Sequence, residues 1–399
     1  MRLAGKKEQS FRTIAWLRAK AQLSAAVGIT ATVLAALAVT APAQAATSAK
    51  AASHDVWQLA YSTHGGPSKQ FDAITAPAKN DAWAVADTNT PNKTVTPAFF
   101  HWNGRTWSSV TVKAAAGLNF GYAEFQGIHP AYSTSPSNVW FFGLNQKTYA
   151  VEALVYNGKG WHVQSLRDFA YPLAVLGPKN VWGESLKSYT STTATSTVLT
   201  HWNGRTWSDV TIQGIDPVAS SAGGRAWIMT IDGAPVHVSG EATSGPPIVY
   251  RITGAVLNTV GVPGQATITQ DQSGIAAAPD GRLWILGCNP SCFTGVVYSG
   301  SGNKWASSVI PADRMVTVVS TFSYDGKSGF WDGPYGHWTG STMIDTDNQT
   351  SKQLADAFWS AGVAVPIPGT DSAWSAGYVQ RTAQSTPTNA VIAVYGPLP

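Results

Sequence analysis

Residues Ser137-Asn138-Val139-Trp140-Phe141-Phe142-Gly143 form one of seven copies of a short motif in which a turn leads into a tryptophan. The tryptophan of each copy is called a repeat tryptophan from here on. The seven repeat tryptophans are Trp83, Trp140, Trp182, Trp227, Trp284, Trp331 and Trp374. Neighbouring repeat tryptophans are 57, 42, 45, 57, 47 and 43 residues apart. One aromatic residue at each return of this period indicates a chain built from seven similar units.

Each unit predicts four short strands. The first is rich in small residues, as in 71–74 and 125–128, and the second carries the repeat tryptophan. The third ends on an aromatic residue such as Trp102, and the fourth opens on a tryptophan such as Trp107. An Asn-Gly pair often separates these last two strands, which favours a hairpin. The sequence therefore predicts an all-β fold, a seven-bladed β-propeller of four-stranded antiparallel blades.

The last unit lacks a fourth strand of its own, since the chain ends soon after 392–395. Residues 55–60 have the composition of a fourth strand without a preceding third strand. We expect this N-terminal strand to complete the last blade, because a ring with unjoined ends would expose open strand edges. Weaker fourth strands near 256–261 and 343–346 complete the count. Seven blades use every predicted strand, whereas six or eight would not.

The first 45 residues are predicted to be a signal peptide. A basic stretch is followed by an alanine-rich apolar stretch and by Ala43-Gln44-Ala45, which suits signal peptidase. Retention as a membrane anchor is the alternative, although the apolar stretch is near the lower length limit for spanning. Residues 46–53 are expected to be a disordered lead-in, and 54–399 a single propeller domain. The expected location is therefore secreted, or extracellular.

Removal of the signal peptide would change the charge of the chain. Residues 1–45 hold six Lys or Arg and one Glu, so twenty basic and twenty-one acidic residues remain, and the net charge falls from +4 to −1. A nucleic-acid partner is therefore not expected. In an oxidising compartment Cys288 and Cys292 are expected to form a disulfide, because a metal site would need further ligands.

The unit also resembles a known group of repeats. The pattern Asp/Asn-x-Trp-x-x-Gly followed by His-Trp-Asn-Gly-x-x-Trp, as in 201–207, resembles the tryptophan-rich propeller repeats of secreted actinobacterial proteins. It is distantly similar to kelch and galactose-oxidase-type propellers. The resemblance covers roughly residues 55–399 and implies a fold rather than an activity. The paired glycines of kelch units and the Ser and Asp of the sialidase Asp-box are missing, so no catalytic residue is transferred.

Few residues suggest chemistry. His101, His201 and His337 occupy the same strand position in different blades, which indicates a repeated packing or hydrogen-bonding role rather than a metal site. The repeat tryptophans are expected to fill the layers between blades, with stacking on sugars as the alternative. The sequence contains no Gly-x-Ser-x-Gly, phosphate-binding Gly-Lys or zinc-spaced motif. No cofactor, metal or catalytic residue is therefore predicted.

Function is expected in the variable loops of one face, which surround the mouth of the central channel. The predicted binding residues in these loops are Phe120, Tyr122, Glu124, Asp168, Tyr171, Asp216 and Asp271. They favour a monomeric binding protein for a ligand or partner, such as a glycan or an extracellular protein. The alternative is an extracellular carbohydrate-active hydrolase or lyase that uses acidic and Tyr side chains at the channel mouth.

Overall fold

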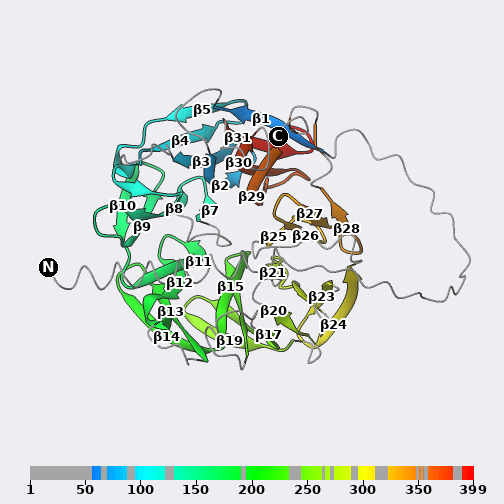
Figure 1. Cartoon of the computed structure of the whole chain (residues 1–399). Coiled ribbons are helices and arrows are strands. Elements are labelled where there is room, and N and C mark those ends of the chain that lie inside the picture. Colours follow the sequence, from blue (N-terminus) through cyan, green and yellow to red (C-terminus); the bar gives the residue numbers. More distant parts are fainter. Residues whose placement is uncertain are drawn as a thin grey trace, which may run out of the picture.

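The computed structural model describes residues 56–63, 70–87, 95–121, 130–189, 195–232, 244–262, 266–269, 274–288, 295–310, 322–346, 350–351, 354, 358–380 and 389–399. Figure 1 shows these segments arranged as a ring of sheets around a central axis. Seven sheets each contribute four antiparallel strands in sequence order from the axis outward, except that the first strand of the chain completes the last blade. The predicted seven-bladed β-propeller is confirmed.

The strands of the seven blades follow one scheme. The innermost strands are β2 (Gln70–Ala78), β7 (Ala131–Ser135), β11 (Phe169–Gly177), β15 (Ile215–Ala222), β21 (Gly274–Ala277), β25 (Phe322–Tyr324) and β29 (Phe358–Pro366). The second strands are β3 (Asp81–Asp87), β8 (Asn138–Asn145), β12 (Asn180–Ser185), β16 (Arg225–Ile231), β22 (Leu283–Cys288), β26 (Phe330–Asp332) and β30 (Ala373–Gln380). In blade 2 the innermost strand lies at 131–135, and the predicted strand at 125–128 lies outside the described residues.

The outer half of each blade is a hairpin. The third strands are β4 (Pro97–Trp102), β9 (Val151–Tyr156), β13 (Ser196–Trp202), β18 (Pro247–Thr253), β23 (Gly295–Ser301), β27 (Gly336–Trp338) and β31 (Asn389–Tyr395). The fourth strands are β5 (Trp107–Val110), β10 (Trp161–Ser165), β14 (Trp207–Gln213), β19 (Val256–Val260), β24 (Lys304–Ile310), β28 (Met343–Asp345) and β1 (Trp57–Ser62).

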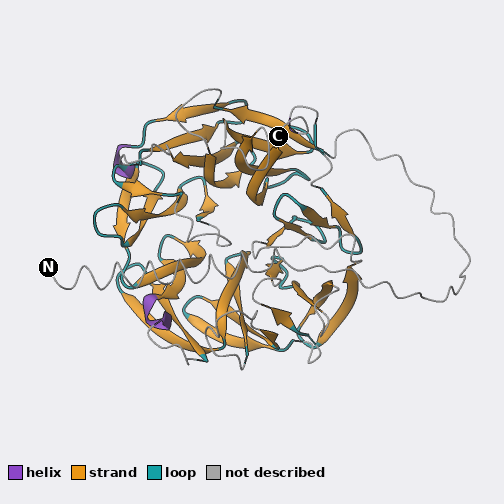
Figure 2. Ribbon diagram, in the orientation of Figure 1, coloured by secondary structure: helices purple, strands orange, loops and turns teal. Residues whose placement is uncertain are grey.

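Other elements are short additions to the ring (Figure 2). They are the 3-10 turns η1 (Lys113–Ala115) and η3 (Leu186–Tyr189), the strand β6 (Leu118–Asn119) and the pair β17 (Ser244–Gly245) and β20 (Ile268–Thr269). Strand β6 pairs with β8, so the long segment between blades 1 and 2 adds a fifth strand to blade 2.

The Asn-Gly pairs lie in four-residue hairpin loops. Trp102 pairs with Trp107 across the loop 103–106, and Gly104 has a φ of 89°. The side-chain oxygen of Asn103 accepts hydrogen bonds from the backbone N–H groups of Arg105 and Thr106, both at 3.0 Å. Asparagine therefore orders the loop from within, and glycine supplies the left-handed conformation that other residues rarely adopt.

The repeat tryptophans lie between neighbouring blades and are 0–7% exposed. Trp374 of blade 7 packs edge-on against Trp102 and Trp107 of blade 1, with ring centroids 5.3 Å apart in both cases. Trp83 of blade 1 meets Trp161 of blade 2 at 5.1 Å. Each indole thus fills the layer between its own blade and the outer hairpin of the next blade.

The N-terminal strand closes the ring as predicted. Strand β1 pairs antiparallel with β31, with Trp57 opposite Tyr395 and Ser62 opposite Val391. Trp57 is fully buried, and its indole Nε1 donates a hydrogen bond to the carbonyl oxygen of Pro334 in blade 6, at 2.9 Å. Its ring lies 6.0 Å from that of the repeat tryptophan Trp331. The closing strand therefore joins blade 6 to blade 7 as well as completing blade 7.

We predict that Trp57→Ala lowers the free energy of unfolding by about 3–5 kcal/mol, the usual cost of truncating a buried tryptophan. Urea unfolding followed by circular dichroism measures this loss. Val256→Ala, on the exposed outer strand β19, is the control and is expected to change stability by less than about 0.5 kcal/mol. A loss below about 1 kcal/mol for Trp57→Ala would show that the closing strand contributes little.

Candidate functional site

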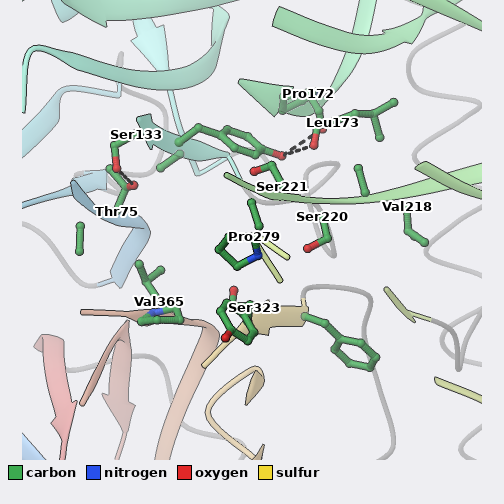
Figure 3. A pocket seen from close by; sticks show the side chains of 18 of the residues that line it. Thr75, Ser133, Pro172, Leu173, Val218, Ser220, Ser221, Pro279, Ser323 and Val365 are labelled. Atoms are coloured by element: carbon green, nitrogen blue, oxygen red, sulfur yellow. Dashed lines mark hydrogen bonds between the residues drawn. The ribbon is translucent and has the colours of Figure 1, made fainter. Parts of the chain in front are cut away.

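The innermost strands of the blades enclose a cavity of about 370 Å³ on the axis of the propeller. Figure 3 shows side chains of several blades directed around this space. One repeated position of the innermost strands contributes to the lining of the cavity. At this position each innermost strand places one residue opposite the repeat tryptophan. These residues are Thr75, Tyr132, Ala174, Ser220, Ala276, Ser323 and Val365. Five of them line the cavity, namely Thr75, Tyr132, Ser220, Ser323 and Val365.

The cavity lining combines hydroxyl groups with apolar surface. Its residues are Thr75, Ala76, Ala131, Tyr132, Ser133, Pro172, Leu173, Pro217, Val218, Ala219, Ser220, Ser221, Ala222, Pro279, Phe322, Ser323, Tyr324, Val365 and Pro366. This set contains no Asp, Glu, Lys, Arg or His. Prolines are tolerated here because an innermost strand has one side free of a neighbouring strand.

Some of the lining hydroxyls hydrogen-bond across blades. Thr75 Oγ1 and Ser133 Oγ are 2.8 Å apart, which links blades 1 and 2. The Tyr132 hydroxyl donates toward the carbonyl oxygens of Pro172 and Leu173 in blade 3, at 3.4 and 3.3 Å, and burial raises its pKa. By contrast, Ser323 has no hydrogen-bond partner for its hydroxyl among the described residues.

Two carboxyl groups, that of Asp87 buried and that of Asp72 partly buried, lie where the chain passes from blade 1 to blade 2. Asp87 ends strand β3, and its Oδ2 accepts hydrogen bonds from the backbone N–H groups of Phe120 at 2.8 Å and Gly121 at 2.6 Å. Asp72 lies on β2, and its Oδ2 accepts the backbone N–H of Asp87 at 2.8 Å. These bonds connect the innermost strand of blade 1 to the segment that precedes blade 2.

Both carboxyl groups have raised pKa values. Burial is the main cause for Asp72, whose pKa is well above its ordinary value, and the nearby charge of Asp87 adds to it. Burial also raises the pKa of Asp87 to about 6, although the bonds from Gly121 and Phe120 favour its charged form. A third acid, Asp332, is 2% exposed, and burial raises its pKa well above the ordinary value.

The structure separates the predicted binding residues into three groups. Phe120 and Tyr171 are buried, at 2% and 6% exposure, so their rings belong to the packing between blades. Asp168 and Asp216 lie near the start of the innermost strands of blades 3 and 4, both with positive φ, at 49° and 51°. Tyr122, Glu124 and Asp271 lie outside the described residues.

Two of the predicted residues lie beside the cavity but do not line it. Tyr171 precedes the lining residue Pro172, and Asp216 precedes the lining residue Pro217. Asp72 and Asp87 were not among the predicted residues, because their proximity depends on how β2 and β3 pair and on the return of the chain at 120–121. Cys292 and the side chain of Cys288 lie outside the described part, so the disulfide stays a prediction.

The three histidines share one arrangement. His101, His201 and His337 each stack on the repeat tryptophan of their own blade, with ring centroids 4.1 Å apart. Nε2 of each ring lies 2.9–3.1 Å from a side-chain oxygen, that of Asp81, Asn180 or Asp325 respectively. They therefore fix the turn and the indole within a blade, in agreement with the packing role expected from their spacing.

No group of three or more His, Cys, Asp or Glu side chains arranged to hold a metal ion occurs within the described segments. Nor do these segments include a helix that is long and apolar enough to cross a membrane.

No protein-family model and no curated protein matches this sequence. Among solved structures, the fold is similar to the β-propeller domain of the Trilobed protease from Pyrococcus furiosus, with 8% identity and a TM-score of 0.50 over 83% of this chain and 95% of that chain. A six-bladed fucose-recognising lectin from Aleuria aurantia is 13% identical over 61% of this chain and 78% of that chain, with a TM-score of 0.36.

A third solved structure is the α-L-arabinofuranosidase from Podospora anserina in complex with cellotriose. It is 8% identical over 87% of this chain and 99% of that chain, with a TM-score of 0.34. The similarity to the Pyrococcus furiosus propeller domain, at 8% identity, shows the fold alone.

We predict that Asp325→Asn reduces the dependence of stability on pH. Burial opposes the charge of Asp325, but hydrogen bonds from His337 and the backbone N–H groups of Gly329 and Lys327 outweigh it and lower its pKa. A lowered carboxyl pKa adds stability above the unfolded value near ~3.9, which is lost as the pH falls through the folded value.

Thermal unfolding between about pH 3 and pH 7 measures this difference. The variant is expected to be about 1.5–3 kcal/mol less stable at neutral pH, with a smaller further loss in acid. Asp280→Asn, at a side chain that is 60% exposed, is the control. An equal loss in acid for both variants and for the wild type would contradict the prediction.

Proposed function

We propose that this protein is a binding propeller that holds an uncharged, hydroxyl-bearing ligand, such as a carbohydrate, in the axial cavity and at its mouth. The lining of the cavity is the observation that carries this proposal. It offers hydroxyls from several blades together with the aromatic side chains of Tyr132, Phe322 and Tyr324. Sugars present the matching combination of hydroxyl groups and apolar faces.

The charge of the lining favours a neutral ligand. Moving a charged group out of water costs several kcal/mol unless an opposite charge compensates for it. None of the residues that line the cavity carries a formal charge at neutral pH. A neutral ligand avoids this cost, and hydroxyls such as Ser323 Oγ have hydrogen-bonding capacity to offer it.

None of the residues that line the cavity carries a carboxyl group, which favours binding over hydrolysis. Asp87 and Asp72 both use a carboxylate oxygen to accept backbone N–H groups. A general acid or base needs its oxygen free to reach the substrate. These two groups are instead part of the scaffold.

The proposal also covers the export of the protein and its location. We infer that residues 1–45 direct export and are removed, and that the secreted propeller acts as a monomer on an extracellular glycan or protein. The predicted loop residues Tyr122, Glu124, Asp168, Asp216 and Asp271 would then extend the cavity into a recognition face. The basic first stretch and the Ala43-Gln44-Ala45 sequence support export and cleavage.

We predict that filling the cavity weakens binding. Neutral and anionic oligosaccharides on a glycan array identify the probe, and calorimetric titration measures its affinity. Ser323→Phe places a ring in the cavity and is expected to weaken binding at least tenfold. Ser208→Phe, on the exposed face of the outer strand β14, is the matched control and is expected to bind as the wild type does.

Three outcomes of these experiments would count against the proposal. Unchanged affinity in Ser323→Phe would remove the cavity from the binding site. Selection of anionic sugars alone would contradict the neutral-ligand argument. Release of sugar fragments during incubation would favour the carbohydrate-active enzyme instead.

A further inference from the structure

We propose that Asp72 and Asp87 form a proton-dependent latch that fastens the segment at Phe120 and Gly121 to blade 1. While the pair of carboxyl groups retains a proton, the latch is closed. Loss of that proton to solvent leaves two negative charges close together, one of them buried, and the segment is released. This inference does not depend on the ligand of the axial cavity.

The geometry places one peptide segment against both acids. Gly121 donates its backbone N–H to Asp87 Oδ2 at 2.6 Å. A Cβ atom added at Gly121 would lie 2.9 Å from Asp72 Oδ1 and 3.1 Å from Asp87 Oδ2, so both groups crowd the same α-carbon. Any larger residue would collide with the pair, which explains glycine at this position.

The latch joins two blades. Residues just before it, in β6, pair with β8 of blade 2, whereas Asp72 and Asp87 belong to β2 and β3 of blade 1. Phe120 lies between the blades, with its ring 5.6 Å from that of Phe99 and 6.2 Å from that of Phe141. Opening of the latch would therefore loosen the contact between blades 1 and 2 at this face.

The pair has no positive partner within the described residues. Asp87 is 5% exposed, and its Oδ1 is buried without a hydrogen-bond partner there. The ionisable group acting on Asp72 is Asp87 itself. Apart from Asp72, the described residues that pair with or bond to Asp87 are neutral: Gln70 on β2 and Pro97 on β4 lie opposite it, and Phe120 and Gly121 donate backbone N–H groups to it. Two like charges in such a site favour retention of a proton.

The sign of the pH dependence follows from the raised pKa values. The closed latch binds more protons than an open one, in which both acids are solvated and titrate near their ordinary value of 3.8. Opening therefore becomes easier as the pH rises. One released proton increases the opening constant by up to about tenfold per pH unit. For Asp87 the increase in the opening constant extends to about pH 6. Asp72, whose pKa is also raised, continues the increase.

Hydrogen exchange followed by mass spectrometry tests the latch in the full chain. Protection of the peptide that covers 118–121 is measured between about pH 4 and pH 8 and corrected for intrinsic exchange. In the wild type, protection is expected to fall as the pH rises. Asp72→Asn removes one charge without a change of shape, so its peptide is expected to be better protected than the wild type at the highest pH.

Asp87→Asn and the double variant complete the set. The amide introduced by Asp87→Asn keeps an oxygen that accepts the two backbone N–H groups, so the double variant is expected to show protection that does not vary with pH. Asp280→Asn is the control and should keep the wild-type profile. Circular dichroism of each variant establishes that the propeller is folded.

Three results would overturn the proposal. Protection that is constant with pH in the wild type would show that no proton is released on opening. Weaker protection of Asp72→Asn at every pH would assign the acid a purely structural role. Protection that responds to calcium or to a chelator at fixed pH would show that a cation, rather than a proton, neutralises the pair.

Discussion

Insertion of one indole between each pair of neighbouring blades is the contact on which the ring depends. The partner is always the outer hairpin of the next blade, where the third and fourth strands meet. This hairpin presents Trp102 and Trp107 to Trp374, Tyr156 and Trp161 to Trp83, and Tyr395 and Trp57 to Trp331. The same rule gives mainly aliphatic partners in blade 4, where Ile252 and Leu257 accompany Trp182. Since aromatic side chains bury the largest apolar area, each insertion makes a large contribution to stability.

This contact also explains the closing strand and the axial cavity. The last third strand lacks a following fourth strand, so the indole of Trp331 would have only half of its partner without Trp57. On the innermost strand of each blade one residue pairs with the repeat tryptophan, and five of these seven residues line the axial cavity. Thr, Ser or Ala occupies five of these seven positions, as in Thr75 and Ser220, because the blades converge there. The period that sets the number of blades therefore also sets the lining of the cavity.

The sequence predicted what local repetition determines. The repeat tryptophans set the blade count, the third and fourth strands were found from their aromatic ends, and the unpaired segment at 55–60 indicated the closure. Burial of Phe120 was not predicted, because its position between blades 1 and 2 depends on the hydrogen bonds of its backbone to Asp87. Asp72 lies within the predicted strand 71–74 but was not predicted as a site residue, since a carboxyl in a strand shows no sign of a neighbour 15 residues away. Tertiary contacts of this kind leave no periodic signal.

Irregular backbone is frequent along the innermost strands. Register shifts occur between Phe71 and Ala73, between Phe169 and Tyr171, between Ile215 and Val218, and between Ala361 and Val363. A bulge frees one residue from the regular alternation of a strand and redirects its side chain. In blades 1 and 4 the bulges contain Asp72 and Asp216, two acids with different surroundings. The outer strands show uninterrupted registers in the same blades. Regular outer strands and irregular innermost strands therefore have different roles: the outer hairpins hold the repeat tryptophans and maintain the ring, and the innermost strands vary from blade to blade without weakening those contacts.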